Sequence, residues 1–238
     1  MTDPAIDTNE KPAKRVHKPA EQRQQEIIAA AVRAFADRGY QVTDMQTIAE
    51  FAGVGKGTLY RHFPNKEELF KSALTHQLDI LRERMMLARD SYSNPLCRLY
   101  AMMHAYLEYF DTHPDTVELF IQERAEFGRE ITPLYFQRMH ENKSDWLFVF
   151  EDIKNSYPVR EFLSAEEMSS LCGELLHGAV YLSMASVPKR TSLARLEQVF
   201  SFYLHGIMHV QNPLSFVEQF NDCLTHSITQ QTQELENN

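Results

Sequence analysis

Cysteine, glycine and proline are scarce in this chain of 238 residues, and long apolar runs are missing. Eight glycines and ten prolines exclude collagen-like and low-complexity architectures, which need far more of both. No stretch reaches the roughly 18 apolar residues of a membrane helix, and residues 1–30 lack the apolar segment of a secretory signal. The three cysteines are far apart and odd in number, which favours a reduced, cytoplasmic protein over a disulfide framework or a zinc cluster. With 43% hydrophobic and 24% charged residues, the composition is that of a globular protein.

Motifs of common enzyme classes are also missing. The chain contains no P-loop, dinucleotide fingerprint, HExxH or GxSxG motif. Glu174 and His177 form a single ExxH pattern, whereas a helical di-iron site needs two such patterns and two further carboxylates. His205 and His209 are four residues apart, a spacing that more often marks an interface or a surface than a metal site. We therefore expect no catalytic site, no metal and no cofactor.

Charge is distributed unevenly along the chain, whose net formal charge is -9. Residues 1–75 hold 11 Lys and Arg against 10 Asp and Glu, and the remaining 163 residues hold 13 against 23. Residues 11–38 alone carry seven basic and three acidic side chains. An acidic protein with a basic end can present that end to a polyanion, although a solvated basic surface explains the charge equally well.

Apolar periodicity predicts an all-α protein with about ten helices. Residues 1–19 lack such periodicity and are expected to form a flexible basic arm, in which Lys14, Arg15 and Lys18 either enter a DNA minor groove or stay idle. Trp146–Ile153 is partly strand-like, but without a partner strand a helix is favoured. Helices are predicted over 20–38, 43–52, 56–63, 66–90, 165–187 and 193–210. Prolines fall at the expected boundaries of later helices, namely Pro95, Pro114, Pro133, Pro158, Pro188 and Pro213.

Three short patterns resemble capping boxes, in which a polar side chain satisfies free backbone donors of a first helical turn. They are Thr43–Gln46, Asn65–Glu68 and Ser164–Glu167. The first begins a short helix that Gly53 ends, and the next short helix follows after a tight turn. This order of helix, short helix, glycine turn and short helix is the helix-turn-helix arrangement of DNA-binding proteins. Residues 55–62 (GKGTLYRH) would then form an exposed face rich in hydrogen-bond donors, with Leu59 and Phe63 directed into the core.

The segment from Gly39 to Phe70 (GYQVTDMQTIAEFAGVGKGTLYRHFPNKEELF) resembles the TetR family of transcriptional regulators. The resemblance implies an N-terminal helix-turn-helix domain over 20–66, linked by a helix over 66–90 to a helical ligand-binding and dimerisation domain over 67–232. It further implies that Thr43, Tyr60 and Lys66 hold phosphates and that Gln46, Thr47, Lys56, Thr58 and Arg61 face the major groove. His62 suits either role, and Gly55 and Gly57 let the backbone approach the duplex closely. Many family members have Ser or Thr at the position of Gly55, so the base contacts of this chain would differ.

The body beyond residue 90 is expected to dimerise. Small residues fall on one face of 165–187, and an apolar stripe runs along 193–210, so two helices from each subunit would form a four-helix bundle. The alternative is that both stripes only fill the core of a single chain. The candidate interface residues are Cys172, Ala179, Ser183, Phe200, Tyr203 and Ile207.

Large aromatic side chains with a few polar neighbours also predict a small-molecule pocket in the body. The candidate ligand-binding residues are Tyr106, Phe110, Phe120, Glu123, Phe127, Trp146, Phe150, His177 and Tyr181. Aromatic stripes of this kind often serve only as core. Taken together, the sequence predicts a homodimeric repressor that binds a palindromic double-stranded DNA operator and is released from it by a small-molecule effector. The alternative is an all-helical metal- or ligand-binding protein without a DNA role.

Overall fold

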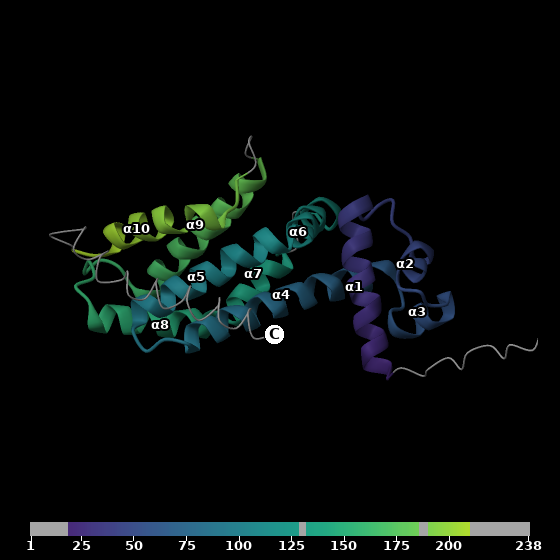
Figure 1. Ribbon diagram of the computed structural model, residues 1–238, viewed down its shortest axis with the longest axis horizontal. Coiled ribbons are helices and arrows are strands. Elements are labelled where there is room, and N and C mark those ends of the chain that lie inside the picture. The colour runs from purple at the N-terminus through teal and green to yellow at the C-terminus, as the bar shows by residue number, and fades with distance from the viewer. Residues whose placement is uncertain (1–18, 129–131, 186–189, 210–238) are drawn as a thin grey trace, which may run out of the picture.

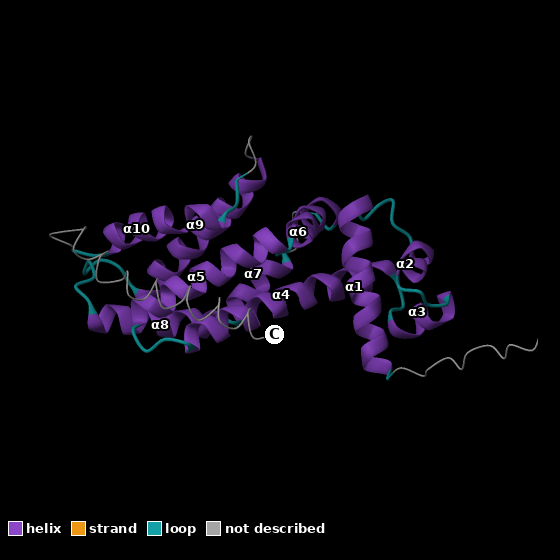
Figure 2. Cartoon of the chain, viewed as in Figure 1, coloured by secondary structure: helices purple, strands orange, loops and turns teal. Residues whose placement is uncertain are grey.

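A computed structural model describes residues 19–128, 132–185 and 190–209, and in these ranges the chain is helical throughout (Figure 2). Ten α-helices are present in this part of the chain. The basic arm, the sites of Ser186 and Pro188, and the helix expected after Pro213 lie outside the described residues. One isolated bridge, between Val159 and Met208, is the nearest approach to sheet structure in the described ranges.

Three helices form a small head at one end of the molecule (Figure 1). They are α1 (Ala20–Arg38), α2 (Met45–Phe51) and α3 (Lys56–His62). The long helix α4 (Lys66–Asp90) starts in the head and continues into the body. The body consists of α5 (Pro95–Thr112), α6 (Pro114–Glu126), α7 (Leu134–Glu141), α8 (Lys143–Ser156), α9 (Ala165–Ala185) and α10 (Leu196–Ile207), with a 3-10 turn at Leu193–Arg195.

Several helix starts confirm the sequence prediction. Asn65 caps α4 by accepting from the backbone N–H of Glu68, and Asn94 caps α5. Ser164 and Glu167 exchange both hydrogen bonds of a capping box at the start of α9. The segment with strand-like composition lies within α8 and is helical.

One local prediction is wrong. The cap of α2 is Asp44, whose carboxylate accepts from the N–H of Thr47 at 2.7 Å, and not Thr43. Cys172 on α9 is a free and buried thiol.

One continuous hydrophobic core runs from the head into the body. In the head it contains Phe35 of α1, Ile48 of α2 and Leu59 of α3, all fully buried. The apolar stripe of α4 extends this core, since Leu69 and Leu74 are also fully buried. A shared core of this kind couples the position of the head to the packing of the body.

Candidate functional site

The turn between α2 and α3 fixes how the head presents α3. Gly53 adopts φ +62°, and its N–H donates to the carbonyl of Glu50 while that of Val54 donates to the carbonyl of Ala49. These two bonds form a Schellman motif, which ends a helix at a residue in the left-handed region. Glycine takes that conformation without strain, so the turn stays tight and α3 crosses α2 closely.

Polar side chains of α3 face outward while Leu59 anchors the helix in the core. Lys56, Tyr60 and Arg61 are exposed, and the Lys56 ammonium lies 5.9 Å from the centroid of the Tyr60 ring. A Cβ atom placed on Gly55 or Gly57 would meet nothing within 4 Å, so the backbone is open to a close partner there. We call the exposed surface formed by Gln46 and residues 55–61 the reading face.

The structure brings most of the predicted DNA-binding residues onto this side of the head. Gln46, Gly55, Lys56, Gly57, Tyr60 and Arg61 are exposed, and Thr47, Thr58 and His62 are half-buried. The Gln46 side-chain amide donates to the Glu50 carboxylate at 2.9 Å, and its second N–H and its carbonyl oxygen remain to bond a base. Hydrogen-bond donors on an exposed short helix are the chemistry that reads base edges in a major groove.

Thr43 does not fit its expected role at a phosphate. The residue is fully buried, and its hydroxyl donates to the carbonyls of Gly39 and Ala34, at 2.7 and 3.1 Å. These bonds hold the turn between α1 and α2. The spacing of a capping box suggested an available hydroxyl, but a contact nine residues back along the chain uses it.

Lys66 is engaged within the head as well. Its ammonium donates to the carbonyl of Tyr40 at 2.8 Å and lies 4.3 Å from the centroid of the Tyr40 ring. The side chain is half-buried and fastens the start of α4 to the loop before α2. A contact to phosphate would need this ammonium to share or leave these partners.

An aromatic joint connects the head to α6. Phe35, Tyr40, Phe70 and Phe127 meet at ring-centroid distances of 5.1 to 5.8 Å. Phe127, one of the expected ligand residues, therefore packs in this joint. The Gln122 side chain adds a bond from α6 to the head by donating to the carbonyl of Phe35 at 2.8 Å. A hydrogen bond between Gln41 and Glu126 reinforces the same contact.

The body contains a cavity of about 560 Å³ between α4, α5, α7, α8 and α9. This volume lies within the range of sites for drug-sized molecules. Its buried wall consists of Leu78, Leu81, Met85, Tyr106, Tyr135 and Leu176. Since the three α4 residues of this wall follow the head on the same helix, the cavity touches the element that carries the head.

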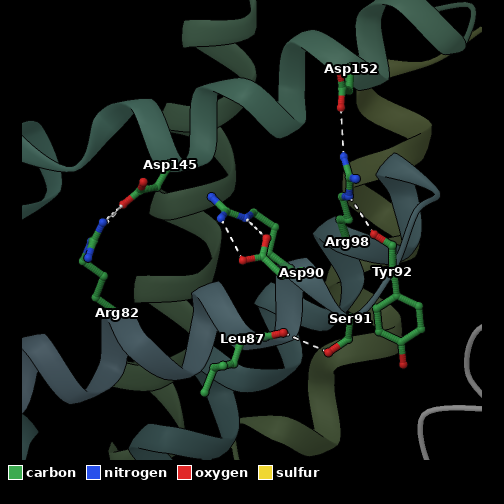
Figure 3. A network of polar contacts seen from close by, with 9 residues as sticks. Arg82, Leu87, Asp90, Ser91, Tyr92, Arg98, Asp145 and Asp152 are labelled. Carbon is green, nitrogen blue, oxygen red and sulfur yellow. Dashed lines mark hydrogen bonds and ion pairs between the residues drawn. The ribbon is translucent and has the colours of Figure 1, made fainter.

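Charged side chains from neighbouring helices form the mouth of the cavity. Arg82 of α4 pairs with Asp145 of α8 at 2.7 Å, a contact visible in Figure 3. Arg138 of α7 pairs with Asp79 of α4 at 2.9 Å, and Lys143 of α8 lies 3.9 Å from Glu166 of α9. These pairs are partly exposed, so each contributes little to stability, but together they neutralise the mouth.

Two of the nine expected ligand residues, Tyr106 and Trp146, line this cavity. The other seven do not line it. Phe110, Phe120 and Phe150 are buried in the core, and Phe127 belongs to the joint. Aromatic composition alone did not distinguish the wall of a cavity from a filled core.

The remaining three expected ligand residues lie just behind the cavity wall. His177 stacks on Tyr135 at 4.9 Å and meets Tyr181 at 4.8 Å. Glu123 accepts from the backbone N–H of Leu134 at 2.8 Å, and its other oxygen is buried without a partner among the described residues. Burial raises the pKa of Glu123 and lowers the pKa of His177, because the interior disfavours the charged form of each.

Several lining residues were not anticipated. Leu78, Leu81 and Met85 of α4 have the periodicity of a core stripe, yet they border empty space. The one available signal was methionine, since Met85, Met86 and Met139 all line the cavity and flexible thioethers are typical of adaptable binding surfaces.

The expected dimer residues fill the core of the single chain. Cys172, Ala179, Ser183, Phe200, Tyr203 and Ile207 are all buried, and the Tyr203 hydroxyl donates to the carbonyl of Met168. The stripe was correctly read as apolar, but α9 and α10 direct it toward each other and toward α5. Leu171, Leu182 and Phe202 are exposed on α9 and α10, and together with the half-buried Leu175 and Val199 they form an apolar surface that we call the outer face.

Metal and membrane features are few in the part of the chain that the structure describes. Within these residues no group of three or more metal-ligating side chains gathers. The Nδ1 atom of His205 bonds to the carbonyl of Ser201 in its own helix. None of the described helices combines the length and apolarity needed to span a bilayer.

Comparison with known proteins agrees with this architecture. Residues 27–73 match the family described as bacterial regulatory proteins, tetR family. The chain is 36% identical over 117 residues to the uncharacterised HTH-type transcriptional regulator YhgD of Bacillus subtilis, covering 48% of this chain and 59% of YhgD. It is 31% identical over 154 residues to the HTH-type transcriptional repressor BepR of Brucella suis, covering 63% of this chain and 73% of BepR.

A third relative is known in both sequence and structure. The HTH-type transcriptional repressor KstR2 of Mycobacterium tuberculosis is 31% identical over 137 residues, covering 57% of this chain and 68% of KstR2. The solved structure of KstR2, described as a ketosteroid transcriptional regulator, superposes with a TM-score of 0.58 at 26% identity and covers 79% of this chain and 96% of that structure. The head, the connecting helix and the helical body thus recur together in a relative, and the chain belongs to the TetR family of DNA-binding transcriptional regulators.

Proposed function

We propose that this protein is a homodimeric repressor that binds a palindromic operator and leaves it when a small molecule enters the cavity of the body. The observation that carries the proposal is the course of α4, which begins beside the reading face and forms one wall of the cavity. Relatives named as repressors support the direction of regulation. The same helix can therefore report occupancy of the cavity to the head.

The reading face would enter the major groove with α3 leading. Lys56 and Arg61 are exposed cations suited to guanine edges, while Tyr60 offers a hydroxyl to a phosphate. In this proposal the side chains of Thr43 and Lys66 stabilise the head itself, through the bonds of the Thr43 hydroxyl to Gly39 and of the Lys66 ammonium to Tyr40. In this proposal the boundary between the DNA-binding domain and the body lies near residue 66, and α4 belongs to both.

A second copy of the chain would cover the outer face. Leu171, Leu175 and Leu182 lie four and seven residues apart on α9, and Val199 and Phe202 lie three apart on α10. Such spacings form a stripe along each helix, and two helices from each subunit suit a four-helix bundle. A twofold pair of heads also matches two half-sites about one DNA turn apart.

Release of the operator requires that the ligand prefer one arrangement of the heads. A ligand with equal affinity for both arrangements shifts nothing, and a near-complete switch needs about a 10⁴-fold difference. The contact of Leu78, Leu81 and Met85 with the cavity provides a place for that difference to arise. A filled cavity would favour the α4 position in which the heads no longer fit adjacent grooves.

The direct test is the affinity for DNA taken from upstream of the protein's own coding region, measured against salt. A phosphate-binding head predicts a linear fall of log affinity with log salt, because counterions are released on binding. Arg61→Ala should lower affinity by ~1–3 kcal/mol and relax base preference at one position of each half-site. A flat salt response together with an unchanged footprint in Arg61→Ala would refute the DNA role.

Metal analysis of the same preparation addresses the alternative of a metal-binding protein without a DNA role. Stoichiometric metal with no retarded DNA band would favour that alternative. A DNA band without any effector response would instead leave a regulator whose body serves only dimerisation.

A further inference from the structure

The buried part of the cavity wall contains one polar pair among apolar side chains. Tyr106 of α5 and Tyr135 of α7 both line the cavity, are buried, and have hydroxyl oxygens 2.8 Å apart. The rest of the buried wall is formed by Leu78, Leu81, Met85 and Leu176. A hydroxyl pair in an apolar wall is a specific recognition feature, since a few placed polar groups orient a ligand in such sites.

Counting protons shows that this pair has a donor to offer. Each hydroxyl has one proton, and a single hydrogen bond joins the two oxygens. The Tyr106 oxygen also lies 3.5 Å from Nδ1 of His177, which can accept the second proton in the tautomer that leaves Nδ1 unprotonated. That distance is at the long limit of a hydrogen bond, so exchanging it for a ligand acceptor costs little. When Tyr106 donates to Tyr135, the Tyr135 proton is free to point into the cavity.

The pair stays protonated under ordinary conditions. Burial raises the pKa of Tyr135 to about 12 and raises the pKa of Tyr106 well above its usual value of 10.0. Both hydroxyls are therefore neutral donors, and the buried wall of the cavity carries no charge that would attract an ionic ligand.

Charge at the mouth is balanced. The lining contains three cations, Arg82, Arg138 and Lys143, and three carboxylates. The carboxylates are Asp145, Glu166 and Glu167. Each cation also has a carboxylate within 4 Å. With three positive and three negative groups, the lining has no net charge to attract an anion or a cation.

We propose that the effector is an uncharged, largely apolar molecule with a carbonyl-type hydrogen-bond acceptor at its buried end, held by the Tyr106–Tyr135 hydroxyl pair. The proposal rests on the proposed function for its regulatory meaning, but ligand binding itself can be measured without DNA. In this proposal the site selects its ligand by a hydrogen bond, and not by shape alone or by charge.

The chain provides its own reporter. Trp146 is its one tryptophan, and it lines the cavity, so energy transfer from Trp146 to a bound naphthalene dye measures occupancy. Three probes separate the classes of ligand: Prodan, a neutral naphthyl ketone; N-phenylnaphthylamine, neutral and without a carbonyl; and anilinonaphthalene sulfonate, an anion. Gly173→Phe provides the test of location, because Gly173 lines the cavity and a large side chain there would compete with a ligand for its space.

The full-length chain should bind the ketone more tightly than the anionic dye, and Gly173→Phe should abolish binding of the ketone. Tyr135→Phe should weaken the ketone about three- to tenfold, the range for one neutral hydrogen bond, and Tyr106→Phe should weaken it less because the Tyr135 proton remains. Both variants should leave the affinity for N-phenylnaphthylamine unchanged. Loss of the donor should also shift the emission of bound Prodan to shorter wavelength. Tyr100→Phe is the matched control, since Tyr100 lies on α5 outside the cavity lining and packs against Phe200.

Equal affinity of the ketone for the native chain and both tyrosine variants would overturn the proposal, even if Gly173→Phe blocks binding. Tighter binding of the anionic dye at the same site would also overturn it. Either result leaves operator release by another ligand intact, so the two proposals fail separately. If no probe binds in a manner sensitive to Gly173→Phe, the acceptor proposal fails, while the salt test on DNA still stands.

Discussion

Replacing Phe202 by glutamate should separate the proposed dimer. Phe202 lies on α10 with 72% of its surface exposed, and it belongs to the outer face. Burying a phenylalanine side chain contributes about 1.5–3 kcal/mol. A twofold axis brings two copies of the side chain into the interface, so Phe202→Glu removes about 3–6 kcal/mol before any cost of placing the two carboxylates there. At 1.4 kcal/mol per tenfold change, the dimer Kd should rise by about 10²–10⁴.

Sedimentation equilibrium over a range of protein concentrations measures this change. The matched control is Leu87→Glu, because Leu87 on α4 is 70% exposed and lies away from the outer face. Both substitutions are on the surface of the single chain, so each should change its free energy of unfolding by no more than ~0.5 kcal/mol. A Phe202→Glu chain that stays dimeric, or a Leu87→Glu chain that dissociates equally, would refute the assignment of the outer face.

Three further predictions concern the head and the aromatic cluster. Lys66→Met should lower the free energy of unfolding by ~1–3 kcal/mol, because the charged hydrogen bond to the carbonyl of Tyr40 is lost, and urea denaturation measures this change. If Lys66 served only to bind phosphate, the substitution would weaken DNA binding and leave the stability unchanged. Gly55→Ser should raise stability by a few tenths of a kcal/mol, about the advantage of serine as an N-cap, because a Cβ there meets nothing; thermal unfolding that shows a loss would indicate that Gly55 is required. Burial lowers the pKa of His177, so its contribution to stability is complete above the unfolded-state pKa of about 6.5 and is lost as the pH falls through the lower native pKa. His177→Gln should therefore make the urea midpoint of unfolding less dependent on pH in that range. An unchanged dependence would exclude His177 as the cause of the pH effect.

The head was predictable because its boundaries are set by local chemistry. Gly53 and Asn65 act within a few residues of their own positions, so their spacing alone indicates where helices end and begin. Thr43 shows the limit of this reasoning. Its pattern with Gln46 is that of a capping box, but its hydroxyl bonds to Ala34 of another helix, and Asp44 takes the cap. A sequence pattern of four residues cannot show a hydrogen bond to a residue of another helix.

The body was predictable in its helices but not in its surfaces. An apolar stripe shows that one side of a helix is covered, but it does not show by what. On α9 and α10 the small and aromatic residues face the chain's own core, and Leu182 and Phe202 remain outside. The cavity was missed for a related reason. Leu81 and Met85 have the periodicity of a core stripe, and only three-dimensional packing shows that the space opposite them is unfilled.

The stripe of α4 serves three successive purposes along one helix. Phe70 packs in the aromatic joint, and Leu78 and Leu81 border the cavity two to three turns later. Between them, both the carbonyl and the side-chain oxygen of Gln77 accept from the buried Tyr109 hydroxyl, which also lies 3.2 Å from the Thr116 hydroxyl.

This hydrogen-bonded knot of Gln77, Tyr109 and Thr116 ties α4 to α5 and α6, one residue before Leu78, the first α4 residue that lines the cavity. Since α6 in turn bonds to the carbonyl of Phe35 through Gln122, a displacement of α4 at the cavity cannot leave α6 behind without breaking buried hydrogen bonds. The head is therefore held by two linked elements, α4 from within its core and α6 from its flank. Because bending of α4 at Gln77 would break the knot, a ligand that displaced α4 would be expected to displace α6 with it.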